Sequence, residues 1–340
     1  MSAAAGRPTE AGRRLLGLVS SRLVWLLVAL AGASLSAAVN VEKVQYRGRS
    51  NAYRLTNGEV ELIVTSDVGP RILRYGFVDG ENLFKEMSPE EEGRLTAGQE
   101  WRLYGGHRIW VGPEEPHYTY AADNSPVAVD ASGDELIAAA PVDVAGIQKQ
   151  ISVRLEPSGT GVTVRHRLVN KSRWPLRFAP WALTMMAPGG TAIALFPPRG
   201  THPEHLAPSN PLVMWRFTNL SDPRWGFFEK YLTLRQDPER DHPEKLGLFR
   251  APTVAAYLLD GDLFVKTFDP PATGDYPDMG SSFETFTNDL FLELETLGPV
   301  TEVQPDGFAD HVETWRLHRG VRVEAWTEAE LDRVIAPLLE

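Results

Sequence analysis

The chain has 340 residues, no cysteine and a formal net charge of −11, with 34 Lys and Arg residues against 45 Asp and Glu residues. An acidic chain without a basic stripe binds a phosphate backbone poorly, so the composition predicts that nucleic acid is not a partner. The absence of cysteine excludes a disulfide framework, and stability must come from a large hydrophobic core, which a chain of this length can bury.

The N-terminal segment has the layout of a secretory signal peptide. It is basic, with four arginines: Arg7, Arg13, Arg14 and Arg22. The apolar run Leu23 to Leu35 follows, too short to span a bilayer, and it leads into the small residues Ser36 to Ala38. The sequence predicts export to the periplasm or the medium, cleavage near Ala38, and no stable membrane span afterwards. The alternative is an uncleaved anchor extending back to Leu15, although Arg22 interrupts it.

From Val41 onward, apolar residues recur with the period of two that is typical of strands. In the run Glu59 to Val64, for example, Val60, Leu62 and Val64 share one face. The same alternation predicts strands at 149–155, 161–169, 251–259, 263–268, 283–297 and 311–317. Frequent Gly, Pro, Asn and Asp turns separate these runs, so the pattern predicts an all-β sandwich or barrel.

Other segments depart from the alternation. Residues 88–98 are acidic and predict a short helix or an exposed loop, whereas 197–210 and 236–247 are rich in Pro, His and charge and predict long loops. Thr327 to Glu330 forms a capping box, which predicts a short C-terminal helix through about Leu338. No repeat or internal linker occurs, so 39–340 is predicted to be one domain after the signal peptide 1–38.

Three stretches resemble the galactose mutarotase (aldose 1-epimerase) superfamily. They are Tyr53 to Leu73, Val162 to Leu176, and Leu292 to Thr296 followed by Gln304 to Asp306 and Thr314 to Leu317. The block Tyr104 to Trp110, with Pro113 to Pro116 and Tyr120 to Pro126, resembles a bacterial branch of that superfamily. The resemblance implies a large β-sandwich of the mutarotase-like kind, and a carbohydrate, either a monosaccharide or an oligosaccharide, as the ligand.

By that resemblance, Glu295 is the expected catalytic base, which takes the proton from the anomeric hydroxyl of a sugar. Period two places Glu293 and Glu295 on one face of their strand, with Leu292 and Leu294 on the other. Two neighbouring carboxylates repel each other, so one of them should have a raised pKa, which suits proton transfer. The alternative is that both are solvated on an exposed strand face or bind sugar hydroxyls.

The resemblance also makes His107 a candidate catalytic residue, at the position of the family's first sugar-binding histidine. Its neighbours Gly105 and Gly106 would let the backbone approach a ligand, and the guanidinium of Arg108 could hold a hydroxyl or a carboxylate. Arg71 is a further candidate for sugar contact. A loop histidine satisfied by the backbone, and a structural arginine, are the alternatives.

One departure from the family pattern concerns the second histidine, the usual acid. The corresponding strand here reads Phe178 to Leu183 and contains no histidine. Either His117, His202 or a tyrosine replaces that acid, or the protein binds sugar without turning it over. An acid–base pair that lacks one partner loses about 10²–10⁴-fold in rate.

Aromatic side chains supply the flat surfaces on which pyranose rings pack. Trp110, Trp181 and Trp315 are predicted to line the sugar site, together with Glu313, while at least half of the nine tryptophans should be core. His166, in line with Val162 and Val164, is predicted to point inward with its hydrogen bonds satisfied.

No cofactor or metal site is predicted. In His202 to His205 a proline breaks the spacing of a helical zinc motif, and no phosphate loop, nucleophile elbow or dinucleotide fingerprint occurs. Four functions stay open at this point: a carbohydrate-binding protein, an active aldose 1-epimerase or related hexose isomerase, a glycan-cleaving enzyme that pairs Glu295 with Glu114 or Glu313, and a structural sandwich of an envelope assembly.

Overall fold

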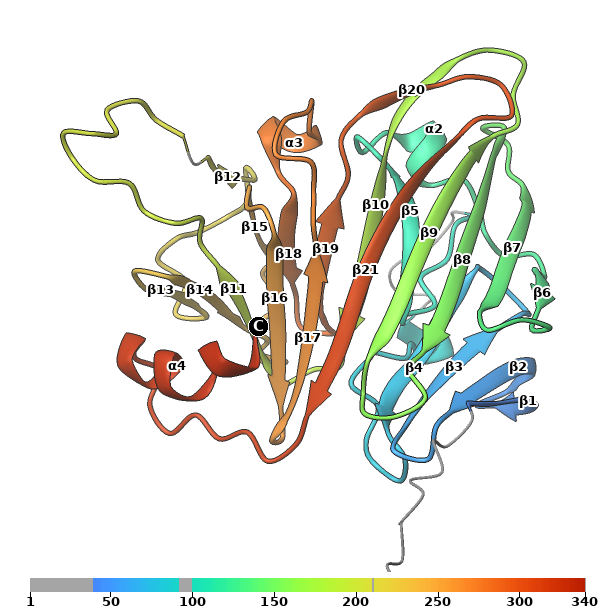
Figure 1. The fold of residues 1–340 in the computed structure, drawn as a ribbon, viewed down its shortest axis with the longest axis horizontal. Helices are drawn as coiled ribbons and strands as arrows, with labels where there is room; N and C mark the ends of the chain where they lie inside the picture. The colour runs from blue at the N-terminus through green and yellow to red at the C-terminus, as the bar shows by residue number, and fades with distance from the viewer. Residues whose placement is uncertain (1–38, 92–99, 210, 340) are drawn as a thin grey trace, which may run out of the picture. The chain divides into compact units, whose positions relative to one another are not determined.

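Two large antiparallel sheets dominate the computed structural model, which describes residues 39–91, 100–209 and 211–339 (Figure 1). The all-β prediction is therefore confirmed. The predicted signal peptide lies outside the described residues. Among those residues, no helix combines the length and the apolar character needed to cross a membrane.

The larger sheet has 11 strands and carries the N-terminal third of the described chain on one side and late strands on the other. Its order is β1 (Asn40–Tyr46), β2 (Arg49–Thr56), β3 (Val60–Thr65), β4 (Arg71–Phe77), β5 (His107–Gly112), β10 (Leu176–Met186), β19 (Leu292–Leu297), β18 (Phe283–Thr287), β15 (Glu244–Leu248) and β12 (Leu212–Met214), with β20 (Thr301–Val303) also paired to β10.

The smaller sheet has 10 strands. Its order is β13 (Trp225–Phe227), β14 (Tyr231–Arg235), β11 (Thr191–Leu195), β16 (Thr253–Leu259), β17 (Asp262–Phe268), β21 (Phe308–His318), β9 (Val162–Asn170), β8 (Ile147–Leu155), β7 (Leu136–Val142) and β6 (Ala128–Asp130).

The core lies between the two sheets. Period two along each strand turns alternate residues inward, so one cluster joins Leu62 and Leu294 of the larger sheet to Phe264 and Trp315 of the smaller one. Burying each such side chain stabilises the fold by about 1.5–3 kcal/mol. In β21 the alternation is nearly complete: every second residue from His311 to Leu317 is buried, and those between are exposed.

Short helices complete the fold. They are α2 (Pro116–Thr119), α3 (Pro277–Gly280), α4 (Glu328–Val334) and the 3₁₀ turn η1 (Ala336–Leu338). Helix α4, red at the lower left of Figure 1, packs Leu331 and Ile335 on Ile193 and Val265, on the outer side of the smaller sheet. The hydroxyl of Thr327 accepts the N–H of Glu330 at 3.3 Å, whereas the Glu330 carboxylate pairs with Arg333, so half of the predicted capping box forms.

The secondary structure predicted for two segments is wrong. The run 283–297 forms two strands, because Asn288 accepts the N–H groups of Leu290 and Phe291 and turns the chain between β18 and β19. The predicted loop 236–247 contains most of β15, whose pairing with β18 overrides its polar composition. The described residues from Val39 onward belong to one compact unit.

Candidate functional site

The strand register gathers polar side chains on the outer face of the larger sheet, turned away from the smaller sheet. Arg108 of β5, Leu183 of β10, Glu295 of β19 and Glu284 of β18 are neighbours in one row across four strands. Trp110 and Trp181 pair in the next row on the same face. The predicted face-sharing of Glu293 and Glu295 is confirmed, since Leu292 and Leu294 lie in the core.

His107 and Glu295, both assigned to the sugar site by the family resemblance, do not meet in the structure. His107 pairs with Thr184 of β10, and Thr184 pairs with Leu294, so this row points into the core. Paired strand residues share a face and successive residues alternate. His107 and Glu295 therefore lie on opposite faces of the larger sheet and cannot contact one ligand as acid and base.

Glycines beside His107 serve packing instead of ligand approach. Gly106 has φ +67°, and a Cβ there would lie 2.4 Å from the carbonyl oxygen of Ile72. Gly105 has φ +78°, and its Cβ would lie 2.2 Å from the carbonyl oxygen of Lys85. Both positions require glycine because neighbouring backbone segments pass too close for any side chain.

A cavity of about 680 Å³ opens on the outer face of the larger sheet. Its walls include three aromatic rings, Trp101, Trp110 and Tyr120, whose centroids lie 5.2–5.3 Å apart. Arg108 and Glu293 supply its charged groups, and Phe286 and Phe291 close the side nearest β18 and β19. The volume falls within the usual range for small-molecule sites, about 300–1,000 Å³.

Arg108 lies over the aromatic wall. Its guanidinium carbon is 4.2 Å from the Trp110 ring centroid and 5.7 Å from that of Trp101, which are cation–π distances. Its Nη2 lies 3.4 Å from a carboxylate oxygen of Glu293. Burial lowers the pKa of Arg108 to about 10, which leaves it charged at neutral pH.

Glu293 is the titratable carboxyl of the cavity. Burial raises its pKa to about 7; Arg108 opposes this shift and the nearby Glu295 adds to it. The predicted raised pKa of one member of the carboxylate pair is confirmed, and burial contributes more to it than the repulsion that predicted it. A carboxyl with this pKa can donate or accept a proton at neutral pH.

Glu295 lies deeper and is held by two donors. Its Oε2 accepts the indole N–H of Trp181 at 2.9 Å and the ammonium of Lys245 at 3.0 Å. Lys245 also lies 2.7 Å from Glu284 and within 5 Å of the rings of Trp181 and Trp215. Burial alone would lower the pKa of Lys245, but Glu295 and Glu284 together raise it. Glu295 is fully buried and does not line the cavity beside Glu293.

Arg71 is buried at the start of β4. Its Nη2 donates to Asp123 at 2.7 Å, and Nη1 donates to the carbonyl of Gly105 at 3.3 Å. The guanidinium also lies over the Tyr104 ring at 5.1 Å. These contacts give Arg71 a structural role in anchoring the segments that contain Gly105 and Asp123.

The remaining sequence candidates, Glu313 and Trp315, join His107 between the sheets. Glu313 accepts the Trp315 indole N–H at 2.8 Å, the ammonium of Lys266 at 2.9 Å, and the hydroxyl of Thr296. Burial would raise the pKa of Glu313, but Lys266 and the neighbouring histidines hold it well below its ordinary value. All of these side chains are buried in the core, away from the outer-face cavity.

The proton positions of the histidines follow from their partners. The Nδ1–H of His166 donates to the His311 carbonyl at 3.0 Å, so its Nε2 accepts from His107 Nε2–H at 2.6 Å. His107 Nδ1 then accepts the hydroxyl of Thr184 at 2.8 Å, and Thr184 in turn accepts from Lys266 at 3.0 Å. The prediction that His166 points inward with satisfied hydrogen bonds is confirmed.

His107, His166 and Glu313 form a group with metal-ligand side chains, with donor atoms within 4.8 Å of one another. Each donor atom, however, already has a protein partner. A cation would have to displace the indole N–H of Trp315 from Glu313 Oε2, the carboxylate oxygen that faces His107, and separate two imidazole nitrogens that now share a proton. The donor set therefore fits a protein hydrogen-bond network better than a metal site.

Sequence reasoning missed Lys245, Trp101 and Lys266. The polar composition of 236–247 places Lys245 in a predicted loop, although Leu246 and Leu248, two residues apart, could have indicated a strand. Trp101 sits in a segment without regular structure, where periodicity gives no signal. Lys266 stands alone among apolar residues of a predicted strand, and a buried lysine without a sequence neighbour of opposite charge has no local signature.

Comparisons with known proteins identify the fold. A candidate aldose 1-epimerase from Klebsiella pneumoniae aligns over 87% of this chain and 85% of its own, with 14% identity and a TM-score of 0.54. A galactose mutarotase-like protein from Lactobacillus casei aligns over 82% and 100%, with 9% identity and a TM-score of 0.51. The Slr1438 protein from Synechocystis aligns over 82% and 99%, with 12% identity and a TM-score of 0.51.

No protein-family model and no curated protein matches the sequence. The similarity to solved structures shows that the chain has the galactose mutarotase-like fold, as the sequence resemblance implied.

Proposed function

We propose that this protein binds a carbohydrate in the cavity on the outer face of the larger sheet. The observation that supports this most strongly is the combination of three aromatic rings with the charged pair Arg108 and Glu293 in one cavity of about 680 Å³. Sugars present apolar C–H faces and a ring of hydroxyls, and this lining offers flat rings beside charged hydrogen-bonding groups.

Two buried donors of the cavity residues make no hydrogen bond within the described chain. They are the indole N–H of Trp101 and the Nε–H of Arg108. Buried donors without partners are rare in proteins, and a ligand oxygen is one way to satisfy them. A sugar hydroxyl or ring oxygen in the cavity would accept these hydrogens while the pyranose ring packs on the aromatic wall.

Saturation-transfer NMR against a panel of monosaccharides and oligosaccharides tests this proposal. We expect transfer from the wild-type protein to at least one sugar, and at least a tenfold higher dissociation constant in Trp101→Phe, which keeps an aromatic ring at this position but removes the indole N–H. Trp326→Phe, at an exposed tryptophan outside the cavity, is the matched control and should bind normally. Absence of transfer to every sugar, or unchanged affinity in Trp101→Phe, contradicts the proposal.

A second candidate function, interconversion of sugar anomers, is favoured by one observation. Glu293 faces the cavity with a pKa of about 7, suited to proton transfer, whereas Glu295 is held by Trp181 and Lys245. If the protein accelerates anomer exchange, Glu293→Gln should reduce the rate about 10²-fold or more while sugar binding persists. Loss of exchange in Glu295→Gln with normal exchange in Glu293→Gln would instead support Glu295 as the base. Release of reducing ends from a glycan would favour the glycan-cleaving alternative.

The proposal includes export, with residues 1–38 removed and 39–340 as the mature domain. The basic leader, the short apolar run and the small residues before Val39 support it. N-terminal sequencing of the protein recovered from the periplasm or the medium tests it, and an N-terminus near Val39 is expected. Recovery of the uncleaved chain from the membrane fraction would support the anchor alternative.

A further inference from the structure

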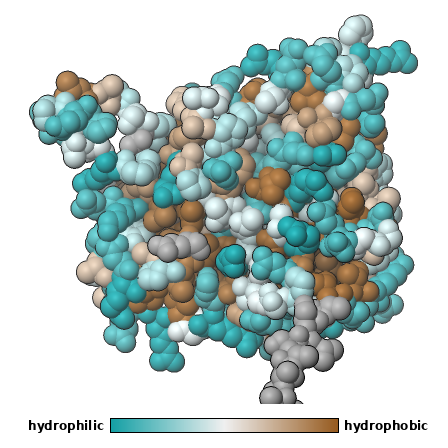
Figure 2. Space-filling model, in the orientation of Figure 1, coloured by the Kyte–Doolittle hydropathy of each residue, from teal (hydrophilic) through white to brown (hydrophobic). Residues whose placement is uncertain are grey.

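A second cavity, of about 600 Å³, lies on the outer side of the smaller sheet, beside the C-terminal helices. Its apolar surface comes from Leu195 and Phe196 at the end of β11, Val254 of β16, and Ala336 and Leu339 near the C-terminus. Figure 2 shows apolar residues gathered next to the C-terminus on this face of the molecule. The sugar cavity proposed above belongs to the other sheet, so the two sites share no residue.

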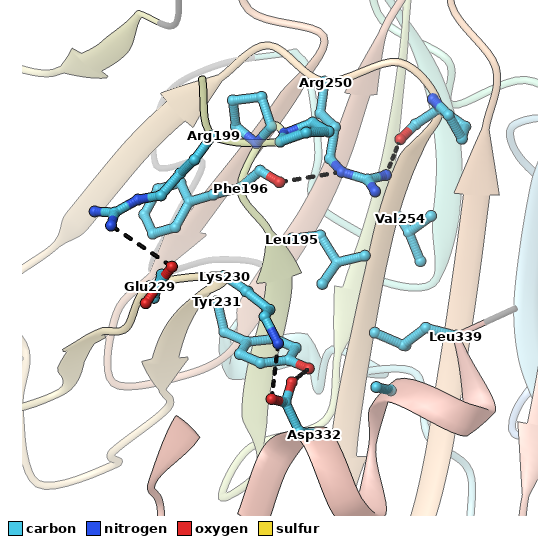
Figure 3. A pocket seen from close by; sticks show the side chains of 14 residues that line it. Leu195, Phe196, Arg199, Glu229, Lys230, Tyr231, Arg250, Val254, Asp332 and Leu339 are labelled. Carbon is cyan, nitrogen blue, oxygen red and sulfur yellow. Dashed lines mark hydrogen bonds and ion pairs between the residues drawn. The ribbon is translucent and has the colours of Figure 1, made fainter. Parts of the chain in front are cut away.

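Polar groups in the lining occupy distinct positions (Figure 3). At one end, Asp332 accepts from Lys230 Nζ and from the Tyr231 hydroxyl, each at 2.7 Å. At the other end, in the upper part of the view, lies Arg250. Leu195, Val254 and Leu339 lie between these ends, so the cavity has an apolar middle.

Arg250 has no carboxylate partner within the described residues. Its Nε donates to the carbonyl of Phe196 at 3.2 Å, and its Nη1 donates to the carbonyl of Pro252. No hydrogen bond within the described chain uses its Nη2. Burial lowers the pKa of Arg250, and no neighbouring carboxylate opposes that shift. A guanidinium fixed by two backbone carbonyls and left without a counter-charge offers its remaining N–H groups to an anion.

The charge balance of the lining points to a single negative charge. The other two cations, Arg199 and Lys230, have carboxylate partners at 3.7 Å and 2.7 Å, in Glu229 and Asp332. The unbalanced charge therefore resides on Arg250, in a chain with a net charge of −11. A dianion would exceed what one guanidinium compensates, and a neutral apolar ligand would leave it without a counter-charge.

We propose that this cavity binds an amphipathic monocarboxylate, with its carboxylate on Arg250 and its apolar chain along Leu195, Val254 and Leu339. The cavity volume suits a small molecule. The apolar middle removes the hydrocarbon chain from water, while Arg250 selects the anionic head group over neutral and cationic analogues.

Isothermal titration of the full-length protein with sodium octanoate tests this site. Octanol and octylammonium, which carry the same chain with a neutral and a cationic head, and acetate, which carries the head alone, complete the series. We expect octanoate to bind with one site per protein and at least tenfold more tightly than the other three. Equal binding of octanol or octylammonium, equal binding of acetate, or no binding of octanoate overturns the proposal.

Two variants test whether octanoate binds in this cavity. Arg250→Met removes the head-group partner, and Ala336→Phe fills the apolar part while leaving Arg250 in place; each should weaken octanoate binding at least tenfold. Arg333→Met, which breaks an exposed contact with Glu330 within helix α4, is the matched control and should bind normally. If Arg250→Met does not fold, the ligand series and Ala336→Phe decide. Unchanged octanoate binding in Ala336→Phe means that the ligand lies elsewhere, which contradicts the proposal.

Discussion

Two closely similar ionic groups lie on opposite sides of the larger sheet, in different surroundings. Between the sheets, Glu313 of β21 accepts from Lys266 of β17 and from the indole N–H of Trp315. On the outer face, Glu295 accepts from Lys245 and from the indole N–H of Trp181. Each group therefore joins a buried glutamate, a lysine and a tryptophan through contacts of 2.8–3.0 Å.

The difference lies in what surrounds each group. Between the sheets, the histidines and threonines continue the hydrogen bonds in a chain, and the unpartnered atom of this network in the described residues is His311 Nδ1. On the outer face, Arg108 Nε and Trp101 Nε1, in two residues that line the cavity, have no partner within the described chain. A closed network stabilises the fold, whereas polar atoms left open beside a cavity are available to a ligand.

The largest effect is expected from Lys266→Met. The substitution leaves Glu313, whose pKa is held well below its ordinary value, charged and buried without its cation. Losing one partner of a buried pair should lower the free energy of unfolding by about 3–5 kcal/mol, measured by urea denaturation. Lys171→Met, which removes an exposed pair with Asp306, is the control and should change it by less than about 1 kcal/mol. A change as small as the control's would mean that the core network does not stabilise the fold.

Lys245→Met should cost less, about 1–3 kcal/mol, although Lys245 is similarly buried. Its partner Glu284 has a pKa well above the ordinary value, raised chiefly by burial, and can take up a proton when the ammonium is lost. The same denaturation experiment measures the change. If Lys245→Met destabilises as much as Lys266→Met, the two ionic groups contribute equally to the fold and the contrast between the faces fails.

The groups on the two sides of the larger sheet should also have opposite effects on the pH dependence of stability. Glu293 has a pKa of about 7 in the folded protein against 4.5 ordinarily, so its contribution is complete below pH 4.5 and is lost as pH rises towards 7. His166 has a pKa of about 4 against 6.5, so its contribution is present above pH 6.5 and is lost as pH falls towards 4.

Removing the Glu293 carboxyl should make the pH dependence that His166 causes easier to measure. In Glu293→Gln, the free energy of unfolding should rise with pH between 5 and 6.5 more steeply than in the wild type, by about 1–2 kcal/mol over that interval. Denaturation at a series of pH values measures the slope. Identical slopes in the two proteins would show that the pKa of Glu293 is not raised.

The smallest expected effect on the free energy of unfolding is that of Trp101→Phe, compared with Trp181→Phe. Trp101→Phe removes an N–H that has no partner in the described residues, so the free energy of unfolding should change by less than about 1 kcal/mol. Trp181→Phe, the matched variant, removes the bond to Glu295 and should cost about 1–3 kcal/mol. Thermal or urea unfolding of both variants measures the difference. A larger loss in Trp101→Phe than in Trp181→Phe would mean that the Trp101 N–H serves the fold.

Much of the strand content could be predicted from the sequence, because alternation is a local property. It located β3, β8, β9, β16, β17 and β21 to within a few residues, and it placed Glu293 and Glu295 on one face. It failed where the pairing partner decides: β15 begins inside the polar stretch 236–247 and is a strand because it pairs with β18. The run 283–297 was divided by one asparagine whose side chain turns the backbone.

Site residues were predicted less well, for the same reason. Arg108, Trp110, Trp181, Glu293 and Glu295 all lie on the outer face, whereas His107, Glu313 and Trp315 face the core. His107 and Arg108 are consecutive residues of β5, and that single step places their side chains on opposite sides of the sheet. Neither the residue types nor their spacing indicate which face of a strand the second sheet will cover.

The sequence by itself determined that this chain is a disulfide-free β protein, which residues alternate, and which pairs share a strand face. Only the tertiary structure decided which of those faces is sealed by the second sheet and which opens on a cavity. The physical reason is that alternation arises from the backbone of each strand, whereas burial and pKa depend on groups that are distant in the chain, such as Lys245 beside Glu295 and Lys266 beside Glu313.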